Sequence, residues 1–197
     1  INGEWIDENP ANGAYSYGSG EMATKVATAA DYVHSHTTVP TVATLYWQVS
    51  TSNRPLNSTF TWAKNNLVNT GYASKLDVVL LSTYVEDAPL GSGFDEIMST
   101  LATTFSGKSI GLGEFDYFYA DTPRYFWSLI HLNAASTEAA AQAARPTLAT
   151  QYYSAMLAYP TSIGGGFWWY FQEESTGTPG TNLQNAIVGV ANGIYYG

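Results

Sequence analysis

The sequence has 197 residues, of which 45% are hydrophobic and only 12% are charged, and its formal net charge is -9 at pH 7. This length indicates a single domain, residues 1–197, with enough apolar residues for an ordinary core. The excess of Asp and Glu over Lys and Arg argues against binding to a nucleic-acid backbone or to an anionic membrane surface. No cysteine is present, which excludes disulfides, thiolate catalysis and cysteine-ligated metals.

The sequence also predicts the localisation of the protein. No apolar run approaches the roughly 18 residues that a transmembrane helix requires. Residues 1–4 do not form a signal peptide and read as a chain that has already been cut. Scarce lysine, abundant Ser, Thr, Tyr and Gly, and the acidic balance predict a secreted, extracellular protein.

Strand-like and helix-like segments alternate along the whole chain. Strands are predicted where β-branched, aromatic or unbroken apolar runs occur, at 1–6, 39–49, 76–85, 109–118 and 163–171. Apolar residues at helical spacing predict helices over 22–33, 60–68, 97–105, within 123–159 and over 183–194. Pro146 is predicted to occupy the first turn of the last helix in the Ala-rich region. Thr181 with Gln184 predicts a capping box at the start of the final helix.

Five β-α units in strict alternation predict an α/β fold with parallel strands joined by helical crossovers. One architecture that fits is a partial barrel of the TIM-barrel type, because a complete eight-stranded barrel typically needs about 250 residues. The alternative is an open, flavodoxin-like doubly wound sheet. The order of the strands distinguishes the two: sequential strands are neighbours throughout a partial barrel, whereas the first strand lies inside an open sheet.

Polar and aromatic residues follow each predicted strand at its carboxyl end, where ligands bind in both architectures. These strand ends are 2–5, 46–48, 82–84, 113–117 and 168–172. Two of them carry a glutamate, Glu4 and Glu114, where the apolar run stops. Together they predict an aromatic-walled hollow that contains two carboxylates.

Two carboxylates that face each other across a cleft are the minimal set for glycoside hydrolysis. One protonates the leaving oxygen, and the other attacks the anomeric carbon or activates water. A separation of roughly 5 to 5.5 Å leads to retention of configuration, and roughly 6.5 to 9.5 Å leads to inversion. The aromatic rings provide faces on which sugar C–H groups stack, and the scarcity of cations suits an uncharged sugar.

The same residues resemble those of a known group. The motifs NGEW (2–5), IGLGEF (110–115) and GGGFWWYF (164–171) resemble the ends of strands four, seven and eight in clan A glycoside hydrolases, which are retaining β/α-barrel enzymes. The resemblance implies Glu4 as the acid/base, Glu114 as the nucleophile and Tyr84 as a hydrogen-bond partner near the nucleophile. It also implies Trp168 or Trp169 as a sugar platform.

Several further residues complete the predicted site. Asp116, which shares the strand face of Glu114 by alternation, is the fallback nucleophile and, with Trp47 and Tyr117, a candidate substrate-binding residue. No metal is expected, because the spacing of the histidines at 34 and 36 places them on different sides of a helix. No cofactor is expected, because the sequence has no Walker loop and no dinucleotide-binding fingerprint. The remaining carboxylates and tryptophans are read as loop charges and packing residues: Glu8, Glu173 and Glu174, and Trp62 and Trp127.

The resemblance covers strands four to eight and leaves strands one to three unaccounted for. Unpaired strands at the sheet edges recruit partners, so we expect self-association or a companion chain that supplies the missing strands, besides a carbohydrate substrate. Two other functions remain open: a non-catalytic carbohydrate-binding remnant of such a barrel, and an open doubly wound protein that binds a different ligand.

Overall fold

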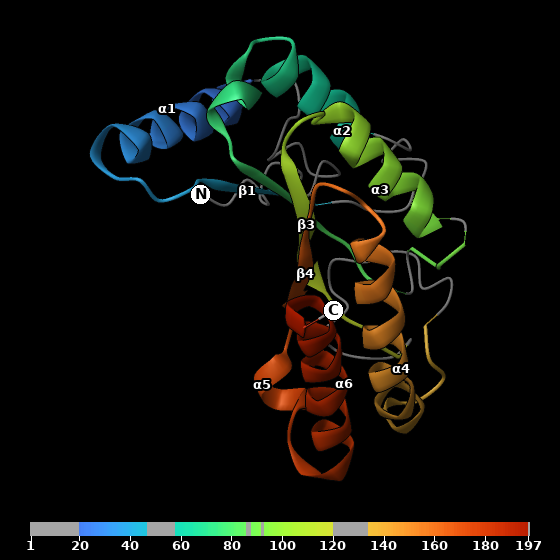
Figure 1. Cartoon of the computed structure of the whole chain (residues 1–197). Coiled ribbons are helices and arrows are strands. Elements are labelled where there is room, and N and C mark those ends of the chain that lie inside the picture. Colours follow the sequence, from blue (N-terminus) through green and yellow to red (C-terminus); the bar gives the residue numbers. More distant parts are fainter. Residues whose placement is uncertain (1–19, 47–57, 86–87, 92, 120–133, 197) are drawn as a thin grey trace.

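The computed structural model describes residues 20–46, 58–85, 88–91, 93–119 and 134–196. Helices and strands alternate along this part of the chain (Figure 1). The strands are β1 (Val42–Tyr46), β2 (Val78–Ser82), β3 (Ser109–Phe115) and β4 (Ser162–Trp168). The helices are α1 (Glu21–His36), α2 (Ser58–Ala63), α3 (Gly93–Thr104), α4 (Glu138–Leu157), α5 (Phe171–Glu174) and α6 (Gly177–Tyr196). The first predicted strand, 1–6, lies outside the described residues.

The four described strands form one parallel sheet in the order β1-β2-β3-β4. The prediction of an α/β fold with parallel strands is therefore confirmed. β1 and β2 correspond to the second and third predicted strands, and they are direct neighbours, with Val42 paired to Val78. In the flavodoxin-like order the first strand of the chain would separate these two, so the observed order disagrees with that alternative.

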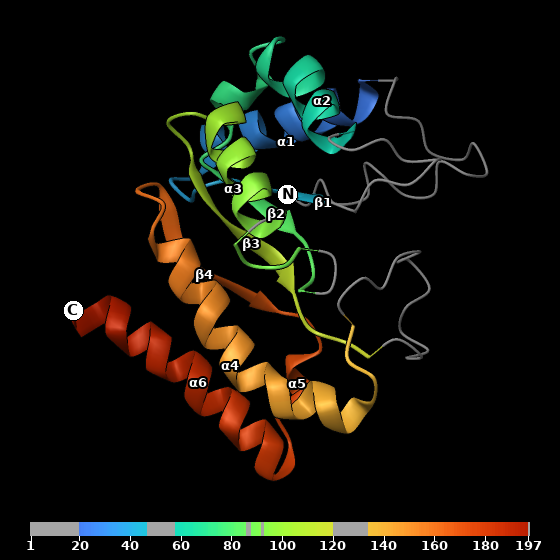
Figure 2. The same cartoon turned by 90° about the vertical axis from the view of Figure 1, so that its right-hand side faces the viewer.

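The described helices pack against one face of the sheet. Leu45, Leu81 and Leu112 point into a single core that also takes side chains from α1, α2, α3, α4 and α6. Leu80 is equally buried but lies outside that core, on the opposite face. Helices α1 to α4 follow one another around one side of the sheet (Figure 1), and the turned view shows α4 and α6 side by side (Figure 2).

Two predicted helix starts are wrong. Pro146 lies inside α4, because the helix already begins at Glu138, where the hydroxyl of Thr137 accepts a hydrogen bond from the backbone N–H of Ala140. The capping box at Thr181 is also absent: α6 begins at Gly177, and the Thr181 hydroxyl donates to the Gly177 carbonyl. In both cases the helix begins earlier in the chain than predicted, so the residue expected at its start lies within it.

Candidate functional site

An irregularity in the pairing of β2 with β3 positions Glu114. Leu81 pairs with Leu112, but the next residue, Ser82, pairs with Glu114, so Gly113 is an extra residue in β3. Such a bulge changes the face on which the following side chain lies, and bulges are frequent next to active sites. With regular pairing Glu114 would share the core-facing side of Leu112. The extra residue removes the carboxylate from that apolar environment.

The bulge uses glycine because there is no room for a side chain. A Cβ at Gly113 would lie 2.3 Å from Cγ2 of Thr44, 3.1 Å from Cβ of Leu80 and 3.2 Å from Oγ of Ser82. Gly113 therefore lies on the face of Leu80, opposite the main core. Because the side chain of Thr44 on β1 reaches over β2 to the backbone of Gly113 on β3, the sheet is concave on this side.

Glu114 is held by a buried tyrosine. The hydroxyl of Tyr84 donates a 2.7 Å hydrogen bond to Oε2 of Glu114, and both side chains are buried. The backbone N–H of Thr83 also bonds to the Glu114 carbonyl at 3.0 Å, which extends the β2–β3 pairing beyond the strand end. The predicted contact between Tyr84 and Glu114 is thus confirmed, and the carboxylate has a fixed position at the carboxyl end of β3.

Aromatic rings lead from this carboxylate to the surface. Tyr84 packs on Phe118 with 5.8 Å between ring centroids, Phe118 packs on Tyr170 at 5.9 Å, and Tyr170 packs on Trp169 at 5.8 Å. Tyr84 and Phe118 form a small buried cluster separate from the main core. Trp169 is 41% exposed, so this aromatic series ends at a side chain that a ligand can reach.

The neighbouring tryptophan lies in the core. Trp168 is only 7% exposed, packs edge-on against Phe115 at 5.3 Å and donates its Nε1–H to Glu174 at 2.8 Å. A ring that is buried to this extent offers no open face on which a sugar could stack. Of the two candidates, Trp169 is the one that remains.

Asp116 is also removed from the predicted site. Its side chain is fully buried, and Oδ1 lies 3.8 Å from Nε of Arg145 on α4. Burial raises the pKa of Asp116 well above its ordinary value, and the negative charge of Glu174 raises it further. The alternation that placed Asp116 beside Glu114 fails: the backbone carbonyl of Asp116 still accepts the N–H of Val85, but its side chain lies beside Arg145 of α4. A group without solvent access cannot contact a sugar, so its roles as fallback nucleophile and substrate-binding residue are wrong.

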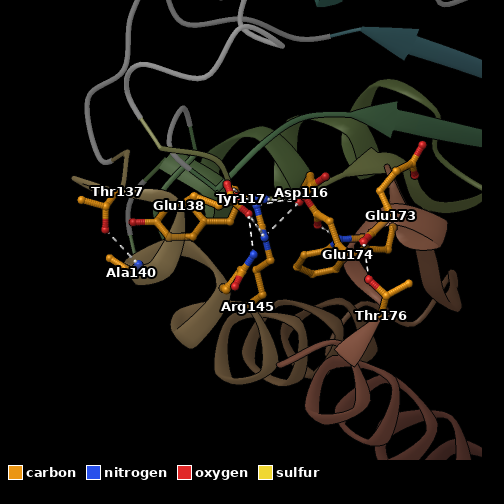
Figure 3. A network of polar contacts seen from close by, with 11 residues as sticks. Asp116, Tyr117, Thr137, Glu138, Ala140, Arg145, Glu173, Glu174 and Thr176 are labelled. Carbon is orange, nitrogen blue, oxygen red and sulfur yellow. Dashed lines mark hydrogen bonds and ion pairs between the residues drawn. The ribbon is translucent and has the colours of Figure 1, made fainter. Parts of the chain in front are cut away.

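Sequence analysis missed a polar cluster around Arg145 (Figure 3). The guanidinium is 2% exposed, and it bonds Glu138 through Nη1 at 2.7 Å, Glu174 through Nη2 at 2.9 Å and the Tyr117 carbonyl through Nε at 3.0 Å. Glu174 is therefore a buried carboxyl group at the end of α5, and its interpretation as a loop charge is wrong. Tyr117 is half-buried and packs against the main core.

The sequence does contain a signal for this cluster. Arg145 stands four residues from Ala141 and from Ala149, and all three are buried. A charged residue in line with the core-facing side of a helix predicts a buried ion pair. Helical spacing could therefore have identified the cation, although not its partners.

Two predicted residues, Glu4 and Trp47, lie outside the described residues, so the separation of the Glu4 and Glu114 carboxyl groups is not described either. Trp62 is buried in the core, as predicted, and Trp127 is outside the described part. Glu173 is exposed, but it lies on α5 and not in a loop as predicted.

Comparison of the chain with protein-family models, with curated proteins and with solved structures gave no match. Among the described helices, none combines the length and apolar character needed to cross a bilayer. Within the same residues, His, Asp and Glu side chains do not gather in threes around a point that could hold a metal ion. Function is therefore argued from the geometry around Glu114.

Proposed function

We propose that this protein is a secreted glycoside hydrolase of the β/α-barrel type that cleaves a neutral oligosaccharide or polysaccharide with retention of configuration. The observation that carries the proposal is the buried Glu114 carboxylate, which a strand bulge and the Tyr84 hydroxyl fix at the carboxyl end of β3. In β/α barrels this end of the strands carries the catalytic groups.

In the proposed reaction Glu114 attacks the anomeric carbon while Glu4 protonates the departing glycosidic oxygen. The glycosyl–Glu114 ester then reacts with water, from which Glu4 takes a proton. Tyr84 holds the carboxylate of Glu114 in one orientation, which limits the reorganisation needed for attack. Both steps need the two carboxyl groups on opposite sides of the sugar.

The surroundings of Glu114 support a sugar as substrate. Trp169 and Tyr170 offer aromatic faces that are connected to Tyr84, the partner of Glu114, through the ring of Phe118. Such faces suit the C–H surfaces of a pyranose ring. Few cations are present in the whole chain, 7 Lys and Arg against 16 Asp and Glu, which disfavours an anionic substrate. A neutral glycan fits both observations.

The arrangement of the sheet supports a partial barrel. Strands that follow one another in the chain are neighbours, and the described helices pack on one face while the face of Gly113 is concave. In a doubly wound sheet, helices would cover both faces. We propose that β1 to β4 are consecutive strands of a β/α barrel.

The test is a panel of aryl glycosides of glucose, galactose, mannose and xylose, together with neutral polysaccharides, assayed with the full chain. Hydrolysis by the natural protein is expected, with retention of the anomeric configuration in the first product seen by NMR. Glu114→Gln should abolish turnover, and Glu114→Ala with added azide should release a glycosyl azide of inverted configuration. Glu173→Gln, which changes an exposed glutamate on α5, should retain full activity.

A second candidate is carbohydrate binding without hydrolysis. Exposed aromatic side chains at Phe167, Trp169 and Phe171 favour it, because binding needs only such faces. It would replace the first proposal if the natural protein binds a glycan from the panel, hydrolyses none, and binds equally well after Glu114→Gln. Activity that survives Glu114→Gln would exclude Glu114 as the nucleophile.

A further inference from the structure

The cluster around Arg145 has one cation for two deeply buried carboxyl groups. Asp116 is fully buried and Glu174 is 3% exposed, whereas Glu138, on the other side of the guanidinium, is 40% exposed. If Asp116 and Glu174 were both ionised, the buried site would carry an uncompensated negative charge. An unpaired buried carboxylate is costly, and it normally takes up a proton instead.

The hydrogen bonds of the two carboxyl groups identify where a proton fits. Oδ1 of Asp116 accepts the backbone N–H of Tyr117 at 2.6 Å, whereas no donor among the described residues reaches the buried Oδ2. Asp116 and Glu174 meet at the same guanidinium: Oδ1 of Asp116 lies 3.8 Å from Nε of Arg145, and Oε1 of Glu174 lies 2.9 Å from Nη2. Two buried carboxylates at neighbouring nitrogens of one guanidinium repel each other, but a proton on one of them removes the repulsion and lets it donate a hydrogen bond to the other.

We infer that Asp116 and Glu174 share a single proton, and that this carboxyl pair, together with Arg145, is a pH-sensitive latch that holds α5 against the end of β3. With one proton shared, the pair carries one negative charge, which the guanidinium neutralises. The pKa of Asp116, raised by burial and then by the charge of Glu174, agrees with this assignment. Tyr153 on α4 also faces Asp116, whose charge adds to burial in raising the pKa of that phenol.

The latch holds α5, and the chain reaches α5 from β4 through a strained turn. Tyr170, between β4 and α5, has a φ of 54°, a left-handed conformation that is unfavourable for a tyrosine. Glu174 at the end of α5 is fixed through Arg145 on α4 and through Nε1 of Trp168. A second negative charge in the cluster would repel Glu174 and loosen this turn, together with the exposed Trp169 that precedes it. The inference does not depend on the proposed function.

The shared proton is tested directly by infrared difference spectroscopy of the full chain near pH 7, where ordinary carboxyl groups, with pKa values of about 4, are ionised. The difference between the natural protein and Asp116→Asn should contain the carbonyl band of one protonated carboxylic acid that the variant has lost; a protonated Glu4 is common to both proteins and cancels in the difference. Glu174→Gln should lose it as well, because the amide then donates to an ionised Asp116. Asp31→Asn, which changes an exposed aspartate on α1, should leave the band in place. Absence of the band in the natural protein, or its persistence in both cluster variants, would overturn the inference.

The latch itself is tested by tryptophan fluorescence between about pH 5 and about pH 9, below the ordinary titration of tyrosine near 10. The natural protein should show a reversible red shift as the pH rises, because Trp168 loses its bond to Glu174 and Trp169 becomes more exposed. Asp116→Asn, which mimics the protonated group, should show no shift in this range. The same red shift in natural protein and variant would show that another group titrates. No red shift in the natural protein would show that the pair does not open α5.

Discussion

Thr44 on β1 and Gly113 on β3 meet over the intervening strand β2, so closely that a Cβ at Gly113 would lie 2.3 Å from Cγ2 of Thr44. This contact links the curvature of the sheet to the position of Glu114. The bulge that turns Glu114 away from the core exists only because residue 113 lacks a side chain.

Gly113→Ala should therefore lower the free energy of unfolding by about 1–3 kcal/mol, the usual range for overpacking a tight site. Thr44→Ser, which removes the methyl group that the new Cβ would meet, should restore part of the loss. Urea denaturation of the two single variants and the double variant measures this coupling. Gly189→Ala on the exposed side of α6, where nothing lies within 4 Å, is the matched control and should not destabilise. Additive effects of the two substitutions would contradict the proposed contact.

Tyr84→Phe should reduce kcat/KM of the proposed hydrolase by roughly 10- to 100-fold, because a hydrogen bond to a charged group contributes about 1.5–3 kcal/mol. The ring packing on Phe118 stays, so the fold should persist. Tyr152→Phe is the control: its hydroxyl bonds the Ala88 carbonyl at 2.7 Å, away from Glu114. It should lower stability by about 1 kcal/mol and leave kcat/KM unchanged. Equal activity of Tyr84→Phe and natural protein would remove Tyr84 from the site.

The adjacent tryptophans should behave oppositely. Trp168→Ala should destabilise the fold by about 3–5 kcal/mol, because it leaves a cavity in the core and removes the indole hydrogen bond to Glu174. Trp169→Ala should change stability little, since the ring is partly exposed, but it should weaken glycan binding or raise KM. Thermal unfolding and titration with a bound oligosaccharide separate the two effects. If Trp169→Ala binds glycans like the natural protein, the aromatic series from Glu114 does not form the sugar platform.

Asp77 should show the opposite pH dependence to Asp116. The backbone N–H of Thr41, at 2.7 Å, lowers the pKa of Asp77, and the ring of His34 adds to the effect. Its contribution to stability is therefore present above the ordinary pKa of about 3.9. That contribution is lost as the pH falls from there through the lowered pKa of the folded state.

Asp77→Asn should lower the free energy of unfolding at neutral pH by up to about 1 kcal/mol, because the group is partly exposed to solvent. The difference from the natural protein should vanish in acid. For Asp116→Asn the difference should instead favour the variant increasingly as the pH rises, because the folded state binds its proton more tightly than the unfolded chain does. Urea denaturation at a series of pH values measures both. Parallel pH profiles of the two variants would contradict these assignments.

The α1 helix illustrates how far sequence pattern reaches. The spacing of Met22 and Val26 predicted a helix, and the helix is present, but Met22 is exposed while Ala23 and Ala30 are fully buried. Hydrophobicity alone favoured the larger side chain. Close packing of α1 on the core instead selected the small ones, because the room between helix and sheet is set by the neighbouring elements.

Sequence alone determined the alternation of helices and strands and the parallel direction of the strands, since these follow from local periodicity and from where each apolar run stops. The contact of Tyr84 with Glu114 was implied by the resemblance to clan A glycoside hydrolases and not by periodicity. Only the tertiary structure decided that Gly113 is an extra residue, that Trp168 is buried while Trp169 is not, and that Asp116 and Glu174 meet at Arg145. Which of two adjacent side chains enters the core depends on pairing register and on contacts between residues far apart in the chain, and a local pattern carries no information about either.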